Sequence, residues 1–379
     1  MTKNIPLFKV YMTQDIDNSL LDVLHSGYVG EGPKVAEFEK NLKKYFCNSH
    51  LVTLNNGTAG LHLAYHMALN QDKPKSWCNN NENEIITTPI TCTATNTPII
   101  SNGAKIVWAD VDPITGNIDP ADIEQKITKY TKAIVMVHWG GTPCEIERIN
   151  NIAKKYGIKT VEDGAHSIGM EYKGNKVGNH SDYTVISLQA IKHITSVDGG
   201  ILMMRSEADY QRAKLLRWYG IDRTEHEGVD LRCELDVAEA GYKFHMNDVC
   251  AVIGNENFKH IDEIISLHRN NAAFYDSAFK SYDKIKCVPK CEDGQSAYWL
   301  YTIHVNNRDE VMKKLAECGI MSSKVHSRND THSMFREFYN ADLPGVEQFN
   351  ATHLCIPVGW WVSKEDREYI ADCVIKYTK

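Results

Sequence analysis

The sequence of 379 residues lacks several patterns that would place it in a common class of protein. It contains no G-x-G-x-x-G motif, the glycine fingerprint with which many α/β proteins hold a dinucleotide, so a nicotinamide-dependent oxidoreductase is the weakest interpretation considered below. It also lacks an excess of positive charge. The formal net charge is −7 at pH 7, which argues against a nucleic-acid-binding protein and says nothing against small anionic ligands.

Long apolar runs and paired cysteines are missing too. No stretch approaches the length of a membrane span, and the N-terminal segment MTKNIPLFKVYMTQD contains no apolar core of signal-peptide length. The eleven cysteines are scattered and include no C-x-x-C pair, which indicates free thiols in a reducing compartment. We therefore expect a cytoplasmic protein that has no nucleic-acid or membrane partner and holds no metal.

What is present, from about residue 52 to residue 204, is an alternation of short β-rich runs with amphipathic helical runs. This order requires crossover connections, and it predicts an α/β fold with a mostly parallel seven-stranded sheet covered by helices on both faces. The expected strands span residues 51–54, 84–88, 105–109, 133–138, 159–162, 183–187 and 200–204, and the expected helices span residues 57–69, 121–127, 144–156 and 206–219.

The pattern changes beyond Asn247, where we predict a second and smaller unit. Residues 1–246 would form an N-terminal segment and a large ligand-binding domain, and residues 247–379 a small C-terminal α/β domain. The expected elements of the small domain are a helical run to about residue 282, a strand at 298–305, a helix at 309–318 and a last helix from residue 364; polar loops are expected at 77–83 and 223–232.

Two short motifs stand where expected strands end, which is where parallel sheets bind ligands. The first, NNGTAG from Asn55, turns from a strand into a helix whose free N–H groups suit an anion, and an ordinary helix cap explains it equally well. The second is the acidic pair in VEDGAHS. Its Asp163 would suit a protonated heterocyclic nitrogen, although most such pairs are solvated or cap a turn.

A third motif, SLQAIKHITSVDGG, places Lys192 beside His193 after an expected strand. A lysine near a buried strand end can have a lowered pKa and form a Schiff base, whereas most lysines are surface charges. Neighbouring side chains of an extended segment point to opposite sides, so only one of the two bases would face a pocket. A fourth motif, GYKFHMND from Gly241, taken alone is typical of a domain hinge.

Together these motifs resemble the DegT/DnrJ/StrS family of sugar aminotransferases, which depend on pyridoxal 5′-phosphate (PLP) and have the aspartate-aminotransferase-like, type I PLP fold. The resemblance runs nearly end to end, and perosamine- and viosamine-type synthases are most similar. The order and register of the motifs make it specific. The matching segments are SGYVGEGPKVAEFE, NNGTAGLHLA, TPITCTATNTPI, VEDGAHSIG, SLQAIKHITSVDGG and GYKFHMND.

The resemblance implies a role for each matching residue. Lys192 stands five residues after Ser187 and seven before the glycine pair, which is the family spacing of the lysine that forms the Schiff base. Asp163 would pair with the pyridine nitrogen of the cofactor. The other cofactor contacts would be Gly57, Thr58 and Ser187 at the phosphate, Ala165 under the ring, Cys92 in place of a common aromatic residue, His166 in place of the usual glutamine, and Lys243 in place of an asparagine that reaches the neighbouring subunit's phosphate.

The resemblance also implies a reaction. The amino group of L-glutamate would pass through PLP to the 4-keto group of a nucleotide-linked 4-keto-6-deoxyhexose, giving a 4-amino-4,6-dideoxysugar of the GDP-perosamine or dTDP-viosamine type used in polysaccharides. The protein would be a homodimer with shared active sites. By position, the substrate-binding candidates are Tyr28, His138, Trp139, His326 and Arg328, each of which ordinary packing or loop polarity explains as well.

Other functions on the same cofactor stay open at this point. The first is a 3-aminotransferase or a dehydratase. Dehydratases of the family carry histidine in place of the lysine, so the register of Lys192 argues against a dehydratase. The adjacent His193 is the reason to keep a dehydratase as an alternative. The second is a non-catalytic PLP-binding sensor. A sensor has no need of Lys192, Asp163 and the phosphate turn together, which argues against it.

Overall fold

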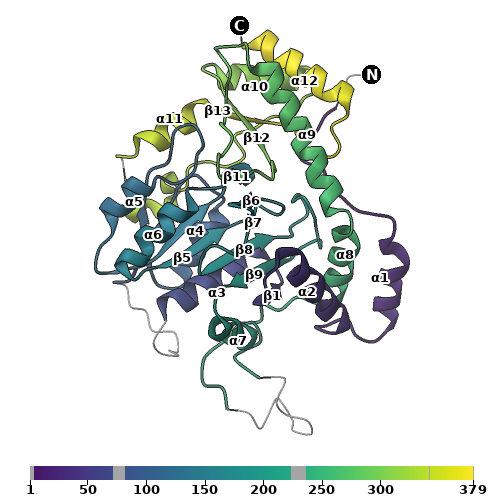
Figure 1. Ribbon diagram of the computed structural model, residues 1–379, viewed down its shortest axis with the longest axis vertical. Coiled ribbons are helices and arrows are strands. Elements are labelled where there is room, and N and C mark those ends of the chain that lie inside the picture. Colours follow the sequence, from purple (N-terminus) through teal and green to yellow (C-terminus); the bar gives the residue numbers. More distant parts are fainter. Residues whose placement is uncertain (1–3, 71–81, 223–235, 341, 379) are drawn as a thin grey trace.

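A seven-stranded sheet with the strand order β1-β9-β8-β5-β4-β2-β3 forms the centre of the larger part of the chain (Figure 1). The computed structural model describes residues 4–70, 82–222, 236–340 and 342–378. All seven predicted strands are present: β1 (Leu51–Leu54), β2 (Glu84–Thr87), β3 (Lys105–Trp108), β4 (Thr131–Val137), β5 (Lys159–Asp163), β8 (Tyr183–Ser187) and β9 (Gly200–Met204).

Five neighbouring strands of the sheet, from β8 to β3, pair in parallel, and only β9 runs against both of its neighbours. The expected mostly parallel sheet is therefore confirmed. The strands are buried on both faces because successive side chains point to opposite sides. Leu51 and Ile201 pack into one hydrophobic cluster, and their chain neighbours Val52 and Leu202 pack into the other.

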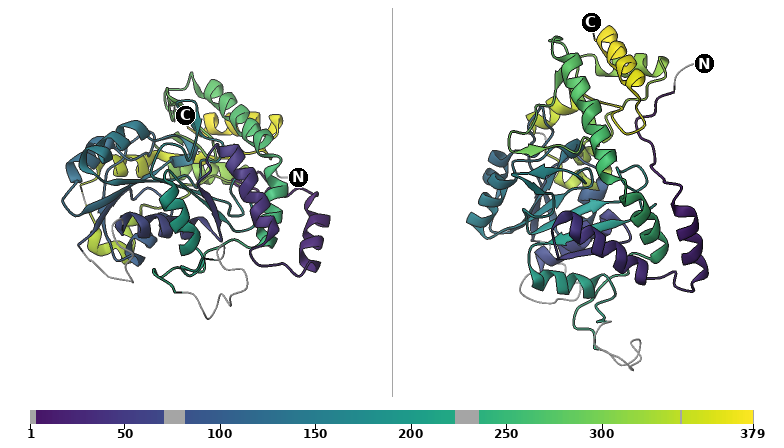
Figure 2. Two further views of the ribbon diagram at one scale, coloured as in Figure 1. Left: turned by 60° about the horizontal axis from the view of Figure 1, so that its bottom comes forward. Right: turned by 45° about the vertical axis from the view of Figure 1, so that its right-hand side comes forward.

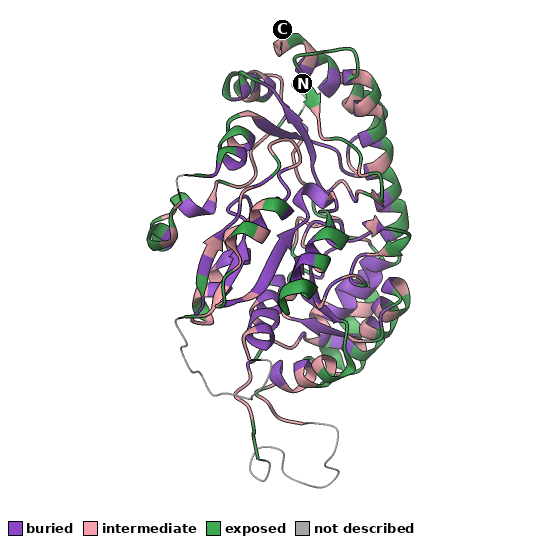
Figure 3. Cartoon of the chain, turned by 60° about the vertical axis from the view of Figure 1, so that its left-hand side comes forward, coloured by how far each residue is buried: buried purple, intermediate pink, exposed green. Residues whose placement is uncertain are grey.

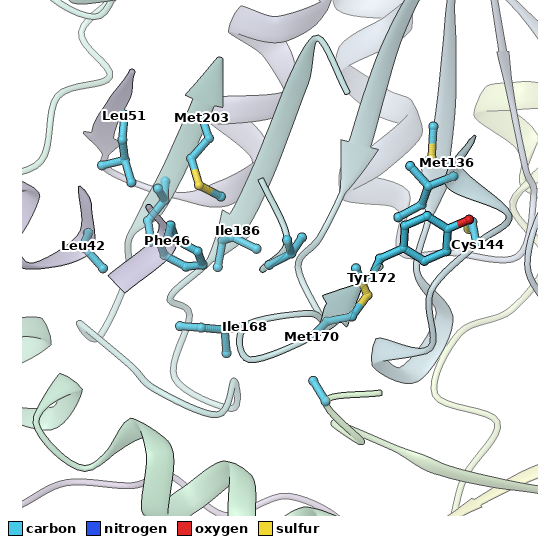
Figure 4. Packing of buried hydrophobic residues seen from close by; sticks show 14 of the residues in the cluster. Leu42, Phe46, Leu51, Met136, Cys144, Ile168, Met170, Tyr172, Ile186 and Met203 are labelled. Carbon is cyan, nitrogen blue, oxygen red and sulfur yellow. The ribbon is translucent and has the colours of Figure 1, made fainter. Parts of the chain in front are cut away.

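Helices cover the two faces of the sheet. On one face, shown in Figure 4, Leu42 and Phe46 of α2 (Pro33–Phe46) lie with Leu51 and Met203 of the sheet, and α6 (Ile146–Tyr156) joins the same cluster. On the other face α3 (Gly57–Leu69) is buried almost throughout, which is typical of the central helix of a parallel sheet. Outward helix surfaces are exposed, as Figure 3 shows. The remaining helices of this part are α4 (Thr93–Ser101), α5 (Pro120–Lys126) and α7 (Glu207–Leu216).

Helix α4 was not predicted. Its sequence, TATNTPIIS, is rich in β-branched residues and contains Pro98, both of which disfavour an isolated helix. The helix packs against α3 and β3, and Thr95, Asn96 and Ile99 are buried there. Tertiary packing thus overrides the local preference of this segment.

The predicted helical run beyond residue 247 is divided. Helix α8 (Asp248–Phe258) packs against α1 (Ile16–His25) and α2, which the further views show at the edge of the molecule (Figure 2). The carboxylate of Asp248 accepts hydrogen bonds from the backbone N–H groups of Gly32, Lys34 and Val35, so it caps α2 from a distant part of the sequence. Helix α9 (Ile261–Phe279) then runs toward the smaller unit (Figure 1).

The smaller unit is built on a three-stranded antiparallel sheet of β10 (Lys286–Cys287), β12 (Tyr301–His304) and β13 (His353–Ile356). Its hydrophobic cluster takes in α9 residues from Ala272 onward and also Ile5 of the N-terminal segment. The predicted boundary at residue 246 stays a prediction. The other helices are α10 (Arg308–Glu317), α11 (Pro344–Thr352) and α12 (Lys364–Tyr377), and β6 (Glu171–Tyr172), β7 (Asn175–Lys176) and β11 (Gly294–Gln295) form a third sheet.

The two polar loops expected at residues 77–83 and 223–232 fall almost wholly outside the described residues. Across the described ranges, no helix combines the length and apolar character that crossing a bilayer requires. Within the same residues, no group of three or more His, Cys, Asp and Glu side chains is arranged to hold a metal ion.

Candidate active site

The predicted phosphate turn packs directly against the ends of two strands. A Cβ atom added to Gly57 would lie 3.1 Å from Cβ of Ser187, the last residue of β8. A Cβ atom added to Gly200, the first residue of β9, would lie 2.4 Å from the carbonyl oxygen of Asn56. A side chain at Gly200 would clash with the backbone of Asn56, and one at Gly57 would require Ser187 to shift slightly, so the two glycines let the start of α3 and Ser187 approach closely.

The start of α3 is an anion-binding arrangement. The side chain of Asn56 accepts a hydrogen bond of 2.7 Å from the N–H of Ala59, which caps the helix. The N–H groups of Gly57 and Thr58, in the first turn, have no partner within a helix and lie at the positive end of its dipole. Gly57 is buried, Thr58 is exposed, and the Ser187 hydroxyl lies beside them. A phosphate fits this set of donors.

Asp163 lies at the carboxyl end of β5 with only 4% of its surface exposed. One carboxylate oxygen accepts a 2.6 Å hydrogen bond from the hydroxyl of Thr95, and the other accepts a 3.0 Å bond from the N–H of Ala165. Two donors fix the orientation of the carboxylate. Thr95 was missed by the sequence analysis, since nothing in the sequence places the start of α4 beside β5.

Lys192 lies in the turn between β8 and β9 and keeps partial access to solvent. Its Nζ atom is 3.7 Å from the centroid of the Trp299 ring. Burial among protein atoms lowers the pKa of this amine to about 8, and the nearby Asp163 and Cys92 oppose that shift. At pH 7 the amine is therefore mostly protonated, but its neutral fraction, which a nucleophile and proton acceptor requires, is far larger than that of an ordinary lysine.

Two histidines, the buried His166 and the partly buried His326, lie near Lys192. The rings of His166 and His326 are nearly parallel, with centroids 5.9 Å apart, and His166 stacks on Trp299 at 3.9 Å. Burial and the charge of Lys192 lower the pKa of both imidazoles, that of His326 to about 4. Nδ1 of His166 and Nε2 of His326 are buried without a hydrogen-bond partner among the described residues. Such orphaned atoms point to a ligand that hydrogen-bonds to them.

Three predicted substrate contacts are instead engaged within the protein. The ring nitrogens of His138 bond to Glu162 at 2.9 Å and to the N–H of Cys144 at 3.2 Å. Trp139 is 1% exposed and its indole N–H donates to the hydroxyl of Thr302 at 3.1 Å. The guanidinium of Arg328 forms a two-bond pair with the buried carboxylate of Asp330, at 2.8 and 2.6 Å.

Two other predicted residues lie on the surface. Tyr28 is 64% exposed in the loop between α1 and α2, and no contact among the described residues joins it to Lys192. Lys243 is exposed, with its ammonium 5.6 Å from the Trp218 ring centroid, while its backbone carbonyl accepts a hydrogen bond from Asn55 beside the phosphate turn. The expected substrate contact of Tyr28, and the expected contact of Lys243 with the neighbouring subunit's phosphate, stay predictions.

The described residues fit PLP. The cofactor carries a phosphate, a pyridine nitrogen, a ring hydroxyl and an aldehyde. The chain offers an anion-binding helix start, a buried carboxylate at Asp163, an unpartnered imidazole nitrogen at His166 and an amine at Lys192. These groups come from four separate segments of the sequence, and Lys192 lies close enough to Asp163 and His166 for their charges to interact. Each motif was therefore only weakly informative alone.

Comparisons with known proteins bear on the identity of this pocket. Residues 10–375 match the model of the DegT/DnrJ/EryC1/StrS aminotransferase family. The UDP-4-amino-4-deoxy-L-arabinose–oxoglutarate aminotransferase of Shewanella sediminis is 31% identical over 347 residues, which cover 89% of this chain and 87% of that protein.

Solved structures agree over nearly the whole chain. The sugar aminotransferase CalS13 of Micromonospora echinospora is 36% identical, with a TM-score of 0.92, and the match covers 98% of this chain and 99% of that one. A sugar aminotransferase of Streptococcus pneumoniae, solved in a PLP form and in a PMP form, is 25% identical. For its PLP form the TM-score is 0.88, covering 99% of this chain and 98% of that one.

Proposed function

Because the chain belongs to the DegT/DnrJ/EryC1/StrS aminotransferase family and is a PLP-dependent nucleotide-sugar aminotransferase, we propose that it moves the amino group of L-glutamate to the 4-keto group of a nucleotide-linked 4-keto-6-deoxyhexose. The family, the type I PLP fold and the cofactor that the sequence motifs predicted are confirmed. The observation that carries the proposal is the amine of Lys192, which lies within one pocket with Asp163 and two unpartnered imidazole nitrogens.

When bound, PLP supplies an electron-withdrawing ring that takes up the amino group of one substrate and passes it to the ketone of the next. We assign the proton transfers to Nζ of Lys192. This amine takes the proton from the α-carbon of glutamate, and its pKa of about 8 lets it hold and release that proton near neutral pH. In the second half of the reaction Nζ delivers a proton to C4 of the sugar.

The remaining residues bind and orient. The ionised carboxylate of Asp163 would keep the pyridine nitrogen protonated, and Thr95 holds the carboxylate in place. Gly57, Thr58 and Ser187 would bind the phosphate. Nδ1 of His166 would bind the ring hydroxyl. These contacts fix the reacting carbon atoms next to Lys192, which is the main contribution that positioning makes to such a reaction.

Two features support the finer choices of substrate. The Shewanella relative is named for a 4-amino sugar and for oxoglutarate, which favours the 4-position and the glutamate–oxoglutarate pair. Nε2 of His326 has no partner among the described residues and faces the same pocket as Lys192, so it is our choice for a substrate contact. Tyr28 and Lys243, both exposed, would complete the pocket of a second copy of the chain in a homodimer.

We place the reaction in the cytoplasm, as the cysteine pattern led us to expect. The nine cysteines in the part of the chain that the structure describes are all unpaired, which suits a reducing compartment. Nucleotide-linked sugars would then meet the enzyme in the same compartment as glutamate.

The test is an assay of the purified protein with PLP, ¹⁵N-labelled L-glutamate and a panel of GDP-, dTDP- and UDP-linked 4-keto-6-deoxyhexoses and 3-keto sugars. We expect ¹⁵N in the sugar product, bonded to C4 by nuclear magnetic resonance, with one equivalent of 2-oxoglutarate formed. Nitrogen at C3 would replace the 4-aminotransferase by a 3-aminotransferase. Loss of the sugar hydroxyl without transfer of nitrogen would favour a dehydratase, and a cofactor spectrum that never responds to glutamate would favour a sensor.

A further inference from the structure

A short segment of the smaller unit, residues 296–300, enters the pocket and was not part of any predicted site. We call it the strap. It precedes β12 and contains Tyr298, whose φ of 48° is a left-handed conformation that non-glycine residues rarely adopt. The N–H groups of Ala297 and Leu300 donate to the carbonyls of Gly141 and Gly140 in the large part, at 3.1 and 3.3 Å. Such a conformation persists only where surrounding contacts fix it.

The strap is also bonded to the turn that carries Lys192. The indole N–H of Trp299 donates to the carbonyl of Ile191 at 2.9 Å. His193 donates from Nε2 to the carbonyl of Ala297 at 3.0 Å. The two residues that flank Lys192 therefore hold the strap, and they fix the plane of the Trp299 ring relative to the lysine. This contact also gives His193 a place in the structure, outside the pocket.

The face of Trp299 is the surface on which the lysine amine rests. Nζ of Lys192 is 3.7 Å from the ring centroid, well within the range of a cation–π contact. Trp299 is 3% exposed, and its ring stacks with His166 at 3.9 Å and with Phe8 at 4.8 Å. A buried, immobilised indole is the strongest aromatic partner for a cation, since water does not compete for it.

We propose that Trp299 is a positioning residue that holds the amine of Lys192 whenever that amine is not bonded to the cofactor, and that stabilises its protonated form. This inference deepens the proposed function and rests on it through the role of Lys192. An amine that carries protons between carbon atoms must be charged for part of each cycle, and the indole face would receive it in that state. Without the ring, only the nearby Asp163 and Cys92 would oppose burial, which disfavours the ammonium.

Simple packing is the competing explanation of Trp299. If the indole only fills space, another apolar side chain can replace it without a change in the pKa of the neighbouring amine. If the indole makes a cation–π contact, replacement by leucine changes that pKa, because leucine has no negative ring face. The acidity of Lys192 in the cofactor-free protein therefore separates the two explanations, and it does so without any measurement of turnover.

The experiment measures the pH dependence of acetylation of Lys192 by trace acetic anhydride in the cofactor-free full chain, with the labelled peptide quantified by mass spectrometry. Wild-type protein should titrate near the pKa of about 8. Trp299→Leu should lower that midpoint by roughly one unit, and Trp299→Phe, which keeps a ring face, by less. Trp360→Leu is the matched control, since Trp360 interacts with Lys9 at 5.1 Å and should leave the Lys192 midpoint unchanged.

The Lys192 midpoint of Trp299→Leu is compared with that of wild-type protein once circular dichroism has shown that the variant folds. If it does not fold, fluorinated tryptophan incorporated in wild-type protein keeps the size of the ring and weakens its negative face, and it should also lower the midpoint. An unchanged midpoint in the folded leucine variant, or in the fluorinated protein, would overturn the proposal. Failure of the sugar assay would leave this titration unaffected, so the two failures are distinguishable.

Discussion

The two halves of the pocket use their polar groups differently. Around the predicted cofactor contacts, Nδ1 of His166 has no hydrogen-bond partner among the described residues, and the first N–H groups of α3 have none within the helix. In the half expected to bind the sugar nucleotide, His138 is paired with Glu162 and Arg328 with Asp330, whereas the buried Nε2 of His326 has no partner in the described residues. Open polar atoms in a buried place indicate a ligand, whereas paired ones indicate structure.

The largest effect on kcat should come from a substitution in the half of the site expected to bind the cofactor. Lys192→Ala removes the amine that we propose carries protons, and we expect kcat to fall by about 10³-fold or more while PLP still binds. The measurement is amine transfer in the sugar assay, with cofactor content determined by absorbance. Lys154→Ala, an exposed lysine of α6, is the control and should retain full activity. Turnover close to wild type in Lys192→Ala would contradict the assignment.

Asp163→Asn tests a second predicted cofactor contact, the carboxylate expected at the pyridine nitrogen. The variant keeps the size of the side chain and the bond from Thr95 but loses the charge that would hold a proton on the pyridine nitrogen. We expect kcat to fall by about 10²-fold. Steady-state kinetics with both substrates would show it as a loss of kcat rather than a rise in KM. A variant with wild-type kcat would show that the charge of Asp163 is not needed.

Substitution of the neighbouring residue, Glu162, should lower stability and leave kcat little changed, the opposite of Asp163→Asn. Its carboxylate is fully buried and paired with His138, so Glu162→Ala leaves that imidazole without its partner. We expect the free energy of unfolding to fall by about 3 kcal/mol, with kcat per folded molecule little changed. Urea unfolding and active-site titration with PLP measure the two quantities. A large loss of kcat in fully folded protein would show that Glu162 takes part in the reaction although its carboxylate is paired within the protein.

The smallest effect is expected at Arg328. Because its guanidinium is already paired in two bonds with Asp330, Arg328→Lys should change KM for the nucleotide sugar by less than about threefold. The same variant should lose about 1 kcal/mol of stability, since lysine cannot form the two-bond pair. A tenfold rise in KM would show that Arg328 exchanges Asp330 for the substrate.

Sequence alone predicted most of the sheet and the motifs of the cofactor half, and the reasons are physical. Strand runs such as residues 183–187 and the turn at Asn55–Gly60 are local patterns, so their chemistry can be seen in a few adjacent letters. Thr95 and Trp299 were missed because each reaches the pocket only through tertiary packing, Thr95 from a helix that local preference disfavours and Trp299 from the smaller unit.

The neighbours Lys192 and His193 show a further limit. We expected them to point apart because of the alternation of an extended segment. The segment is a turn, closed by a hydrogen bond of 2.9 Å from the N–H of Lys192 to the carbonyl of Gln189. Nε2 of His193 is bonded to the carbonyl of Ala297 in the strap, a tertiary contact that the sequence does not reveal. That the two side chains point apart stays a prediction.

The central claim is that Lys192, and not another base of the pocket, is the residue that bonds to the cofactor. Borohydride reduction of the PLP-bound enzyme, followed by proteolysis and mass spectrometry of the phosphopyridoxyl peptide, tests it most directly. We predict a single label on Lys192, within SLQAIKHITSVDGG. A label on any other lysine, or PLP bound without a reducible bond, would contradict the account.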